Sequence, residues 1–487
     1  MKIAISFPPI SENRGTPLLA QNRQFQYFHE STYIYPMVPA YAATLLKQSG
    51  YNVVWDDGVA EEKTYVKWLR EIETTNPDIV AIETKTPVIK RHWAIISDLK
   101  HINSEMKIVL MGDHVTALPR ESLENSEVDY VLTGGDYDFL LLNLVKYLSG
   151  EVKKLDPGIW YKDNGIVKST GKFVLDHNLN SLPFLDRSLT KWKLYSEKNG
   201  NFKETPGSYT MVGRDCWQRK DGGCTFCSWT TLYPIFRVRR PEFLVDEIGI
   251  LIDQYGVKEI FDDTGTFPVG NWLKKFCNMM IERGYKDKVS LSCNMVFGAL
   301  SLDEYKLMKR AGFRMLLFGL ESASQRILDE VNKGLKVEDI VNSCKIAKEA
   351  GLTVHITIMF GYPNASREEE LQTFRLARKL MENGYADTLQ STLLIPYPGT
   401  GLYRKAVENG WLRFSPGEWN HWDMSEPILK SDDVSPEEIK KLCDETYKLF
   451  WSPKYIFRKL LSIRSVGDLK FTFRGARRVM GHIRDFK

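Results

Sequence analysis

Short apolar runs alternate with amphipathic segments twice along the chain, and this pattern restricts the fold more than any other feature of the sequence. Short buried strands separated by helices form parallel sheets that helices cover on both faces. In the first stretch the expected strands are 2–7, 52–55, 79–84, 107–111 and 130–133. Helices are expected between them, for example over 38–48 and 138–148, each of which stops close to a glycine. Residues 1–150 are therefore predicted to form a doubly wound α/β domain.

A second alternation begins near residue 206. Its expected strands are 208–213, 258–263, 288–294, 315–321, 353–361 and 388–396. Helix starts are marked by Pro241 and by the capping-box patterns that begin at Ser301 and Ser366. Six β/α units in about 200 residues are too few for a closed eight-unit barrel. We expect a connector over 151–205, a partial (β/α)6 barrel over 206–412, and a basic, mostly helical segment over 413–487.

The bulk composition excludes several classes of protein. The 487 residues are 43% hydrophobic and 26% charged, with a net charge of +4, which does not favour nucleic-acid binding. No apolar run reaches the ~18 residues of a membrane-spanning helix. The first residues lack the apolar core of a secretory signal and are interrupted by Pro8 and Pro9. An odd, mostly scattered set of seven cysteines fits a reducing compartment, so we expect a cytoplasmic protein.

Three of the cysteines are clustered directly after the first expected barrel strand. Cys216, Cys224 and Cys227 have the spacing C-x7-C-x2-C. Three thiolates can hold a four-iron cluster and leave one iron open for a ligand. Structural zinc usually takes four ligands, and no fourth cysteine or histidine lies nearby in the sequence. Two alternatives stay open, namely zinc completed by a distant His177 or His355, and three cysteines that bind no metal.

The segments around these cysteines resemble the motifs of radical S-adenosylmethionine (SAM) enzymes. Phe226 precedes the last cysteine and Arg214 stands two residues before the first, as the family often has them. The first gap is seven residues here, where the family usually has three. Four further motifs occur in the order of the family's second, fourth, fifth and sixth strands, at 261–267, 319–334, 360–363 and 396–403. The resemblance covers roughly residues 206–412.

The resemblance implies a [4Fe-4S] cluster on Cys216, Cys224 and Cys227, with SAM bound to its open iron. Phe226 would then pack beside the adenine of SAM. Gly361 and Pro363 would let the backbone approach the same ring, although Gly361–Pro363 also reads as a simple turn.

Four further SAM contacts are implied at strand ends. Glu321 and Ser322 would bind the ribose or the amino-acid part, and Asp262 and Asp263 would take the ammonium group. The structural alternatives are an ion pair for Glu321 and a helix-capping or solvated site for the two aspartates. His355 is as compatible with the core as with catalysis.

The first domain contains no G-x-G-x-x-G, so a dinucleotide is not expected. Before a radical SAM barrel it resembles the Rossmann-like cobalamin-binding domain of B12-dependent radical SAM enzymes. The cobalamin contacts that this implies are Thr84, Thr86, Gly112, Asp113, His114, Gly134 and Gly135. Asp113 and His114 are adjacent and do not form the D-x-H-x-x-G motif, so no axial histidine from that motif is expected. The alternative is a domain that has lost its corrin.

The implied function is methylation of an unactivated carbon, or of a phosphinate phosphorus, in a small molecule, lipid or natural-product intermediate. A cobalamin-dependent cyclase, oxidase or rearrangement enzyme is the alternative, and a non-catalytic corrin or iron–sulfur regulator is a weaker one. An RNA methylthiotransferase would need three more cysteines before Cys216, where the chain has none.

The expected partners are a small-molecule or lipid substrate and an electron donor such as flavodoxin or ferredoxin, with no nucleic acid. Residues 452–487 place many Lys and Arg between apolar positions. This pattern predicts either an amphipathic patch that contacts a membrane, or a solvated helical face packed on the barrel. The oligomeric state is left open.

Overall fold

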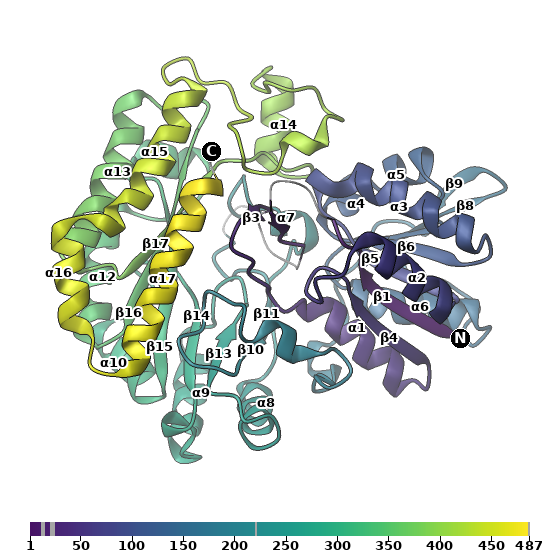
Figure 1. Ribbon diagram of the computed structural model, residues 1–487, viewed down its shortest axis with the longest axis horizontal. Coiled ribbons are helices and arrows are strands. Elements are labelled where there is room, and N and C mark those ends of the chain that lie inside the picture. The colour runs from purple at the N-terminus through teal and green to yellow at the C-terminus, as the bar shows by residue number, and fades with distance from the viewer. Residues whose placement is uncertain (11–14, 20–24, 220–221, 486–487) are drawn as a thin grey trace.

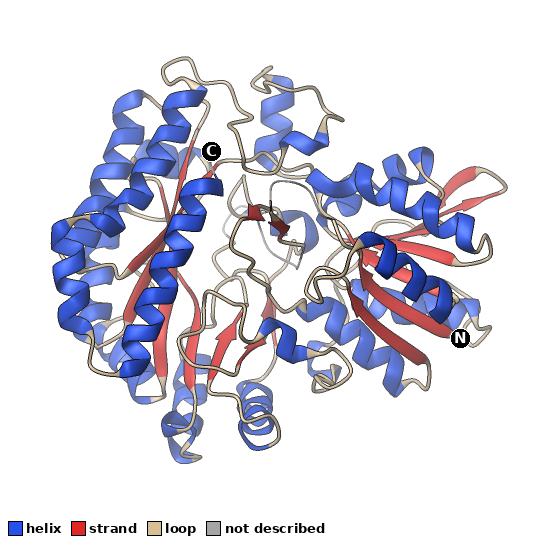
Figure 2. Ribbon diagram, viewed as in Figure 1, coloured by secondary structure: helices blue, strands red, loops and turns tan. Residues whose placement is uncertain are grey.

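Two β-sheets organise the molecule, one of seven strands and one of six (Figures 1 and 2). The structure, a computed structural model, describes residues 1–10, 15–19, 25–219 and 222–485, with the backbone alone for 482–485. The predicted α/β fold with two mainly parallel sheets is confirmed. The boundaries at residues 150, 205 and 412 stay predictions.

The seven-stranded sheet has the order β4-β1-β5-β6-β7-β8-β9. Its parallel strands are β1 (Lys2–Phe7), β4 (Asn52–Asp57), β5 (Ile79–Glu83), β6 (Lys107–Met111) and β7 (Tyr130–Leu132). An antiparallel hairpin, β8 (Ile159–Asp163) and β9 (Ile166–Ser169), extends the edge of the sheet. The strand order reverses between β1 and β5, which is where open α/β sheets bind ligands.

Helices cover both faces of this sheet, as the alternation predicts (Figure 2). They are α1 (Met37–Gln48), α2 (Tyr65–Thr75), α3 (Ile89–Ile102), α4 (Asp113–Ala117), α5 (Pro119–Asn125) and α6 (Tyr137–Leu148). Buried aliphatic side chains fill the space between helices and strands, and every residue of β5 is buried.

The second sheet is a row of six parallel strands with β10 and β17 at its edges. The strands are β10 (Gly207–Thr210), β13 (Glu259–Asp262), β14 (Ser290–Met295), β15 (Phe313–Glu321), β16 (Thr353–Phe360) and β17 (Thr388–Leu393). Helices between them are α8 (Pro241–Asp253), α9 (Asn271–Glu282), α10 (Leu302–Arg310), α11 (Gln325–Glu330), α12 (Val337–Glu349) and α13 (Arg367–Glu382). The capping boxes expected at Ser301 and Ser366 are both formed.

Further elements lie around this sheet. Two short antiparallel pairs are β2 (Thr16–Pro17) with β3 (Tyr27–Phe28), and β11 (Gly213–Arg214) with β12 (Arg237–Val238). The helices are α7 (Trp229–Leu232), α14 (Gly401–Glu408), α15 (Pro436–Lys448), α16 (Pro453–Ser462) and α17 (Val466–Asp485).

The helix α17 lies across the open side of the six-stranded row (Figure 1). Near β10, the guanidinium of Arg474 donates to the carbonyl oxygens of Phe202 at 2.9 Å and Lys203 at 3.2 Å. On its other side α17 packs against α15, which packs on β17. The incomplete barrel is therefore closed by a helix from the C-terminal segment. Among the described residues, no helix is long and apolar enough to cross a bilayer.

Candidate functional site

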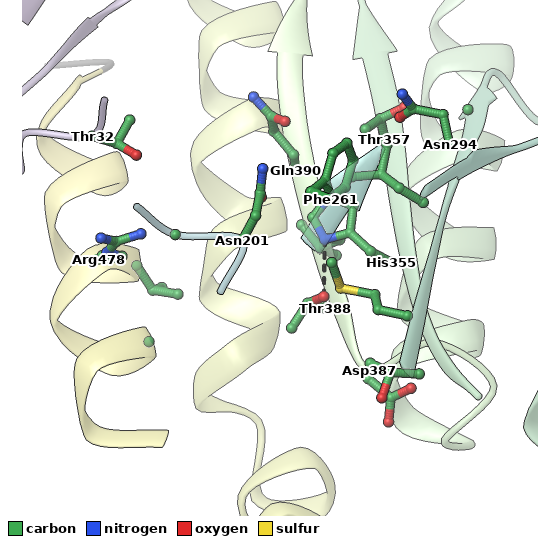
Figure 3. Close-up of a pocket in the computed structure, with 18 of the residues that line it drawn as sticks. Thr32, Asn201, Phe261, Asn294, His355, Thr357, Asp387, Thr388, Gln390 and Arg478 are labelled. Carbon is green, nitrogen blue, oxygen red and sulfur yellow. Dashed lines mark hydrogen bonds between the residues drawn. The ribbon is translucent and has the colours of Figure 1, made fainter. Parts of the chain in front are cut away.

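A cavity of about 860 Å³ occupies the interior of the partial barrel. The barrel strands, the inner faces of α16 and α17, and Leu18 with alternate residues from Gln26 to Ile34 line it. In Figure 3, Thr357 and Gln390 on neighbouring strands and Arg478 on α17 lie around the same space. All three cysteines of the predicted cluster motif line this cavity.

The loop after β13 holds the first of these cysteines. Sγ of Cys216 lies 2.8 Å from Oγ1 of Thr266. A methyl group added to Gly265 would lie 2.6 Å from the carbonyl oxygen of Asp215, so only glycine allows this approach of the two loops. Asp215 itself adopts a positive φ of 82°. The second-strand motif therefore supports the backbone that presents Cys216.

A different segment holds the C-x2-C part of the loop. The amide of Thr225 donates to the carbonyl oxygen of Val331 at 2.9 Å. The side-chain amide of Asn332 donates to the carbonyl oxygen of Gly223, next to Cys224, at 3.1 Å. The turn after α11, which belongs to the fourth-strand motif, therefore fixes the second half of the cysteine loop. Both halves of the cysteine loop therefore reach the cavity, although seven residues separate Cys216 from Cys224.

The three thiols lie close enough to influence one another. Burial raises the pKa of the Cys224 thiol to about 12, and the Cys227 and Cys216 thiols raise it while Lys333 lowers it. Within the described ranges, no three His, Cys, Asp or Glu side chains converge as one metal ion requires. In a multi-iron cluster each cysteine sulfur binds a different iron, so the three sulfurs lie farther apart than the ligands of a single metal ion. Three thiols around one cavity end fit a cluster better than a single zinc ion.

A buried ion pair lies beside the thiols, as the structural alternative for Glu321 predicted, but its second member, Lys333, was not predicted. Glu321, at the end of β15 with a φ of 62°, accepts a hydrogen bond from Nζ of Lys333 at 2.7 Å. Burial lowers the pKa of Lys333. Glu321 and the nearby thiols raise it by more than burial lowers it, so the net pKa of Lys333 lies above its usual value. Both side chains line the cavity. The signal for Lys333 was its place in the fourth-strand motif, in the run Asn-Lys-Gly.

The paired aspartates at the end of β13 have separate environments. Asp262 accepts hydrogen bonds from Oγ1 of Thr210 at 2.8 Å and from the amides of Val212 and Thr264, both at 3.1 Å. Burial raises the pKa of the Asp262 carboxyl. Asp263 instead lines the cavity. Of the two, Asp263 is therefore the one placed to reach a ligand.

The predicted turn at 361–363 is stabilised by hydrogen bonds to a carboxylate that the sequence analysis did not predict. Oε1 of Glu370 accepts hydrogen bonds from the amides of Gly361 at 2.9 Å and Tyr362 at 3.2 Å. Burial raises the pKa of Glu370 to about 7.

The hydroxyl of Tyr362 is buried and has no hydrogen-bond partner among the described residues. Its phenol is close enough to Glu321 and Cys224 for both to influence its pKa, which burial raises well above the usual value. A ligand beside the thiols would give this hydroxyl a partner.

Two other predicted SAM contacts differ in position. Phe226 lines the cavity and packs against the apolar group that contains Tyr362 and Ala365. Ser322 is buried, and its hydroxyl accepts a hydrogen bond from the amide of Ser324 at 3.1 Å, which stabilises the turn before α11. The ligand role of each residue stays a prediction.

The residues predicted to contact cobalamin gather at the carboxyl edge of the seven-stranded sheet. Oγ1 of Thr84 lies 2.7 Å from Nδ1 of His92, and Oγ1 of Thr86 lies 3.2 Å from Nδ1 of His114. Gly112 has a φ of 122°, and an added methyl group would lie 2.5 Å from the carbonyl oxygen of Thr84. Nε2 of His92 is buried without a partner among the described residues. The edge therefore combines hydroxyls, a close backbone approach and an unsatisfied nitrogen, which fits a polar ligand.

Side chains from other parts of the chain cover much of this edge. The ring of Trp419 meets His114 edge-on, with 5.4 Å between centroids, and its Nε1 donates to Glu121 at 2.8 Å. Oε2 of Glu121 also lies 2.9 Å from Nε2 of His114. The buried ammonium of Lys85 pairs with Asp113 at 3.1 Å. These contacts satisfy His114 and Asp113 inside the protein.

Gly134 and Gly135 lie under aromatic rings. A methyl group added to Gly134 would lie 2.4 Å from the ring of Phe173, and one added to Gly135 would lie 1.8 Å from the ring of Tyr233. Gly134 thereby permits close packing of the segment that follows β9, and Gly135 permits close packing of the two halves of the molecule. Their cobalamin role stays a prediction.

Arg214 joins the cysteine loop to the first sheet. Its buried guanidinium donates to Asp136 at 2.7 Å, to Asp138 at 3.0 Å and to the carbonyl oxygen of Gly135 at 3.2 Å. Arg237 also pairs with Asp136. Burial raises the pKa of Asp136, but Arg214 and its other partners hold the net value well below the usual range. The end of β7 and the cluster loop are therefore linked by buried charges.

Comparisons with known proteins agree with this architecture. Residues 211–377 match the family described as the Radical SAM superfamily. An uncharacterized methyltransferase of Pyrococcus horikoshii is 28% identical over 428 residues, which cover 87% of this chain and 90% of that protein. An anaerobic magnesium-protoporphyrin IX monomethyl ester cyclase of Cereibacter sphaeroides is 25% identical, over 87% of this chain and 68% of that protein.

The solved structure of TsrM from Kitasatospora setae shares the fold. TsrM is described as a radical S-adenosylmethionine methyltransferase, and its structure contains cobalamin and a [4Fe-4S] cluster. The TM-score is 0.67 at 15% identity, and the match covers 93% of this chain and 89% of TsrM. The predicted resemblance to B12-dependent radical SAM enzymes, and the prediction of a radical SAM enzyme, are confirmed.

Proposed function

We propose that this protein is a cobalamin-dependent radical SAM methyltransferase. The observation that carries the proposal is that Cys216, Cys224 and Cys227 line one cavity, where two of the family's motifs hold their loop. The similarity to TsrM and to a relative named as a methyltransferase supports the methyl-transfer part.

The proposed cofactors are a [4Fe-4S] cluster, SAM and cobalamin. When bound, the cluster and SAM supply radical chemistry and cobalamin supplies methyl-group transfer. The three cysteines would hold the cluster. SAM would lie against Phe226, Asp263 and Glu321, with the backbone around Gly361 beside it.

Cobalamin would lie at the carboxyl edge of the first sheet, over Thr84, Thr86 and Gly112. The buried Arg214 bridge would fix the distance between that edge and the cluster loop.

The proposed substrate is a small molecule, lipid or natural-product intermediate. A volume of about 860 Å³ lies within the ~300–1,000 Å³ range of pockets that enclose drug-sized ligands. We further propose that a flavodoxin or ferredoxin supplies electrons, and that the reducing cytoplasm preserves the thiols.

A cobalamin-dependent cyclase is the second candidate, because a ring-forming enzyme matches the chain over 87% of its length. The two functions differ in their products from SAM. A methyltransferase of this kind forms S-adenosylhomocysteine together with 5′-deoxyadenosine. A cyclase forms 5′-deoxyadenosine alone.

The test is anaerobic reconstitution with iron, sulfide and hydroxocobalamin, followed by incubation with SAM and a reductant. We expect absorption from both cofactors and formation of 5′-deoxyadenosine. Cys224→Ala should abolish that product, whereas Cys344→Ala, a buried thiol of α12 outside the loop, should not. Unchanged SAM cleavage in Cys224→Ala contradicts the radical mechanism, and failure to take up corrin contradicts the methyltransferase.

A further inference from the structure

The C-terminal helices carry an exposed apolar surface. Nine of the seventeen large hydrophobic side chains that the described part of the chain exposes lie between residues 451 and 480. We call this set the apolar patch. Its members are Trp451, Ile456, Phe457, Leu460, Leu461, Val466, Leu469, Phe473 and Met480.

The helix α16 is oriented with its apolar face outward. Residues 456, 457, 460 and 461 share one face at helical spacing, and Phe457 is 67% exposed. The opposite face makes polar contacts with the barrel. There the hydroxyl of Tyr455 donates to the carbonyl oxygen of Asp387 at 3.0 Å, and Arg458 donates to the carbonyl oxygen of Met381. A surface helix normally buries its apolar stripe, so this reversed orientation needs an apolar partner outside the chain.

The helix α17 continues the same arrangement. Its patch residues 466, 469, 473 and 480 recur at intervals of three, four and seven, which places them on one side of the helix. Phe473 is 78% exposed. The other side carries Arg474 and Arg478 into the cavity lining. Both helices therefore expose apolar side chains and turn basic ones inward or to the rim.

The segment that carries the patch is strongly basic. Residues 451–480 contain eight Lys and Arg and one acidic residue, Asp468. Asp468 pairs with Lys203, which lies outside the segment. Lys454, Arg464 and Lys470 are exposed beside the patch. An apolar face rimmed by basic residues complements an anionic lipid surface, where the apolar side chains enter the interface and the basic ones meet headgroups.

The patch is also continuous with the cavity. Trp451, Ile456 and Leu460 are exposed patch residues and at the same time line the cavity. We propose that α16 and α17 form a docking surface for an anionic lipid bilayer. If the proposed function holds, this position also delivers an amphiphilic lipid from the bilayer to the cavity opening.

The test uses the full chain and sedimentation with two kinds of vesicle, phosphatidylcholine alone and equal parts phosphatidylcholine and phosphatidylglycerol. We expect binding to the mixed vesicles that weakens as salt rises, and much weaker binding to the neutral ones. The variant Phe457→Glu/Leu461→Glu/Phe473→Glu should lower the affinity at least about tenfold. Replacing Lys454 and Lys470 by Gln should lower it about fivefold per residue.

A matched control separates the patch from exposed apolar residues in general. Val66 is 59% exposed and Ile166 is 64% exposed, both on the first sheet's domain side. Val66→Glu/Ile166→Glu should bind vesicles like the wild type. Circular dichroism should show equal folding in both multiple variants, since all substituted side chains are exposed.

Three results would overturn the proposal. They are no sedimentation with anionic vesicles, equal binding by the patch variant, or a stable dimer in analytical ultracentrifugation that the patch variant converts to monomers. Vesicle binding needs neither cofactor nor SAM. A chain that binds vesicles but forms no S-adenosylhomocysteine therefore keeps the docking surface and loses only the methyltransferase.

Discussion

Glycine and carboxylate residues around the cluster loop decide how closely its supporting segments approach. Gly265 lies against the backbone of Asp215 and Cys216, and Glu370 lies under the amides of Gly361 and Tyr362. The glycine acts through the absence of a side chain. The glutamate acts through one buried oxygen that serves two donors.

Replacing Gly265 by Ala should displace the loop that carries Cys216. The added methyl group would lie 2.6 Å from the Asp215 carbonyl oxygen and 3.1 Å from the Cys216 amide nitrogen. We expect a loss of about 1–3 kcal/mol of stability from overpacking and a lower iron content after reconstitution. Gly475→Ala in α17 is the control, because an added methyl group there meets nothing within 4 Å. Iron content and thermal unfolding equal to the wild type in Gly265→Ala would refute this role.

Replacing Glu370 by Gln should change how stability depends on pH. Burial raises the pKa of Glu370 from 4.5 to about 7, so the folded state binds more protons than the unfolded state between these values. Its contribution to stability is then fully present below pH 4.5 and is lost as the pH rises through 7. Glutamine keeps an oxygen for the two amides and cannot ionise.

The expected result is that Glu370→Gln is more stable than the wild type at pH 8, by up to about 3 kcal/mol, and similar to it at pH 5. Thermal unfolding at a series of pH values measures the difference. Glu368→Gln in the exposed first turn of α13 is the control. A stability difference that does not vary with pH would show that Glu370 keeps its ordinary pKa in the fold.

At the scale of elements, the sequence predicted correctly the strands and helix caps that depend on residues close together in the chain. The strands expected at 2–7 and 107–111 have those bounds, and both capping boxes form. The strand expected over 208–213 ends at Thr210, because Gly213 and Arg214 pair antiparallel with β12 instead. That pairing joins residues more than 20 positions apart, and no local pattern announces it.

The N-terminus of α13 offers a test at this scale. The hydroxyl of Ser366 accepts a hydrogen bond from the amide of Glu369, and the side chain of Glu369 accepts one from the amide of Ser366. Ser366→Ala should cost about 1 kcal/mol of stability. Because α13 carries Glu370, the same change should speed hydrogen exchange at Gly361 and Tyr362. Ser301→Ala removes the equivalent box on α10, away from that turn, and should lower stability without affecting exchange at those two amides.

At the scale of the whole molecule, the sequence predicted both sheets and placed the three cysteines, Phe226 and Glu321 where the structure has them, around one cavity. For residues 452–487 it left a helical face packed on the barrel as one of two alternatives, and it did not predict that a helix closes the cavity. The helix α17 fills the open side of the barrel, and Trp419 covers His114 from a segment some 300 positions away, by contacts that depend on the folded surfaces. Lys333 was missed because its partner Glu321 is twelve residues distant across a turn.

The two sheets are linked by buried ion pairs between Arg214, which lies beside the cysteine loop, and two aspartates that follow β7. Arg214 is buried between Asp136 and Asp138, so its removal leaves two carboxylates without their main counter-charge. Breaking a buried ion pair on one side costs about 3–5 kcal/mol, because an uncompensated charge stays in the interior. We expect Arg214→Met to lower the unfolding temperature strongly and to expose 134–138 and 213–219 to hydrogen exchange.

Arg214→Met/Asp138→Asn should recover part of that stability, because it removes one of the stranded charges while Arg237 and His177 still pair with Asp136. Arg326→Met is the control for a half-exposed arginine that pairs with Glu330 and Glu369, and should cost about 1 kcal/mol or less. If Arg214→Met behaved like that control, the two sheets would be held by apolar packing alone. If the double variant were as unstable as the single one, the loss would come from the missing side chain and not from its charge. Partial recovery would show that the cysteine loop and the carboxyl edge of the first sheet are coupled electrostatically, so a change at that edge would affect the cysteines.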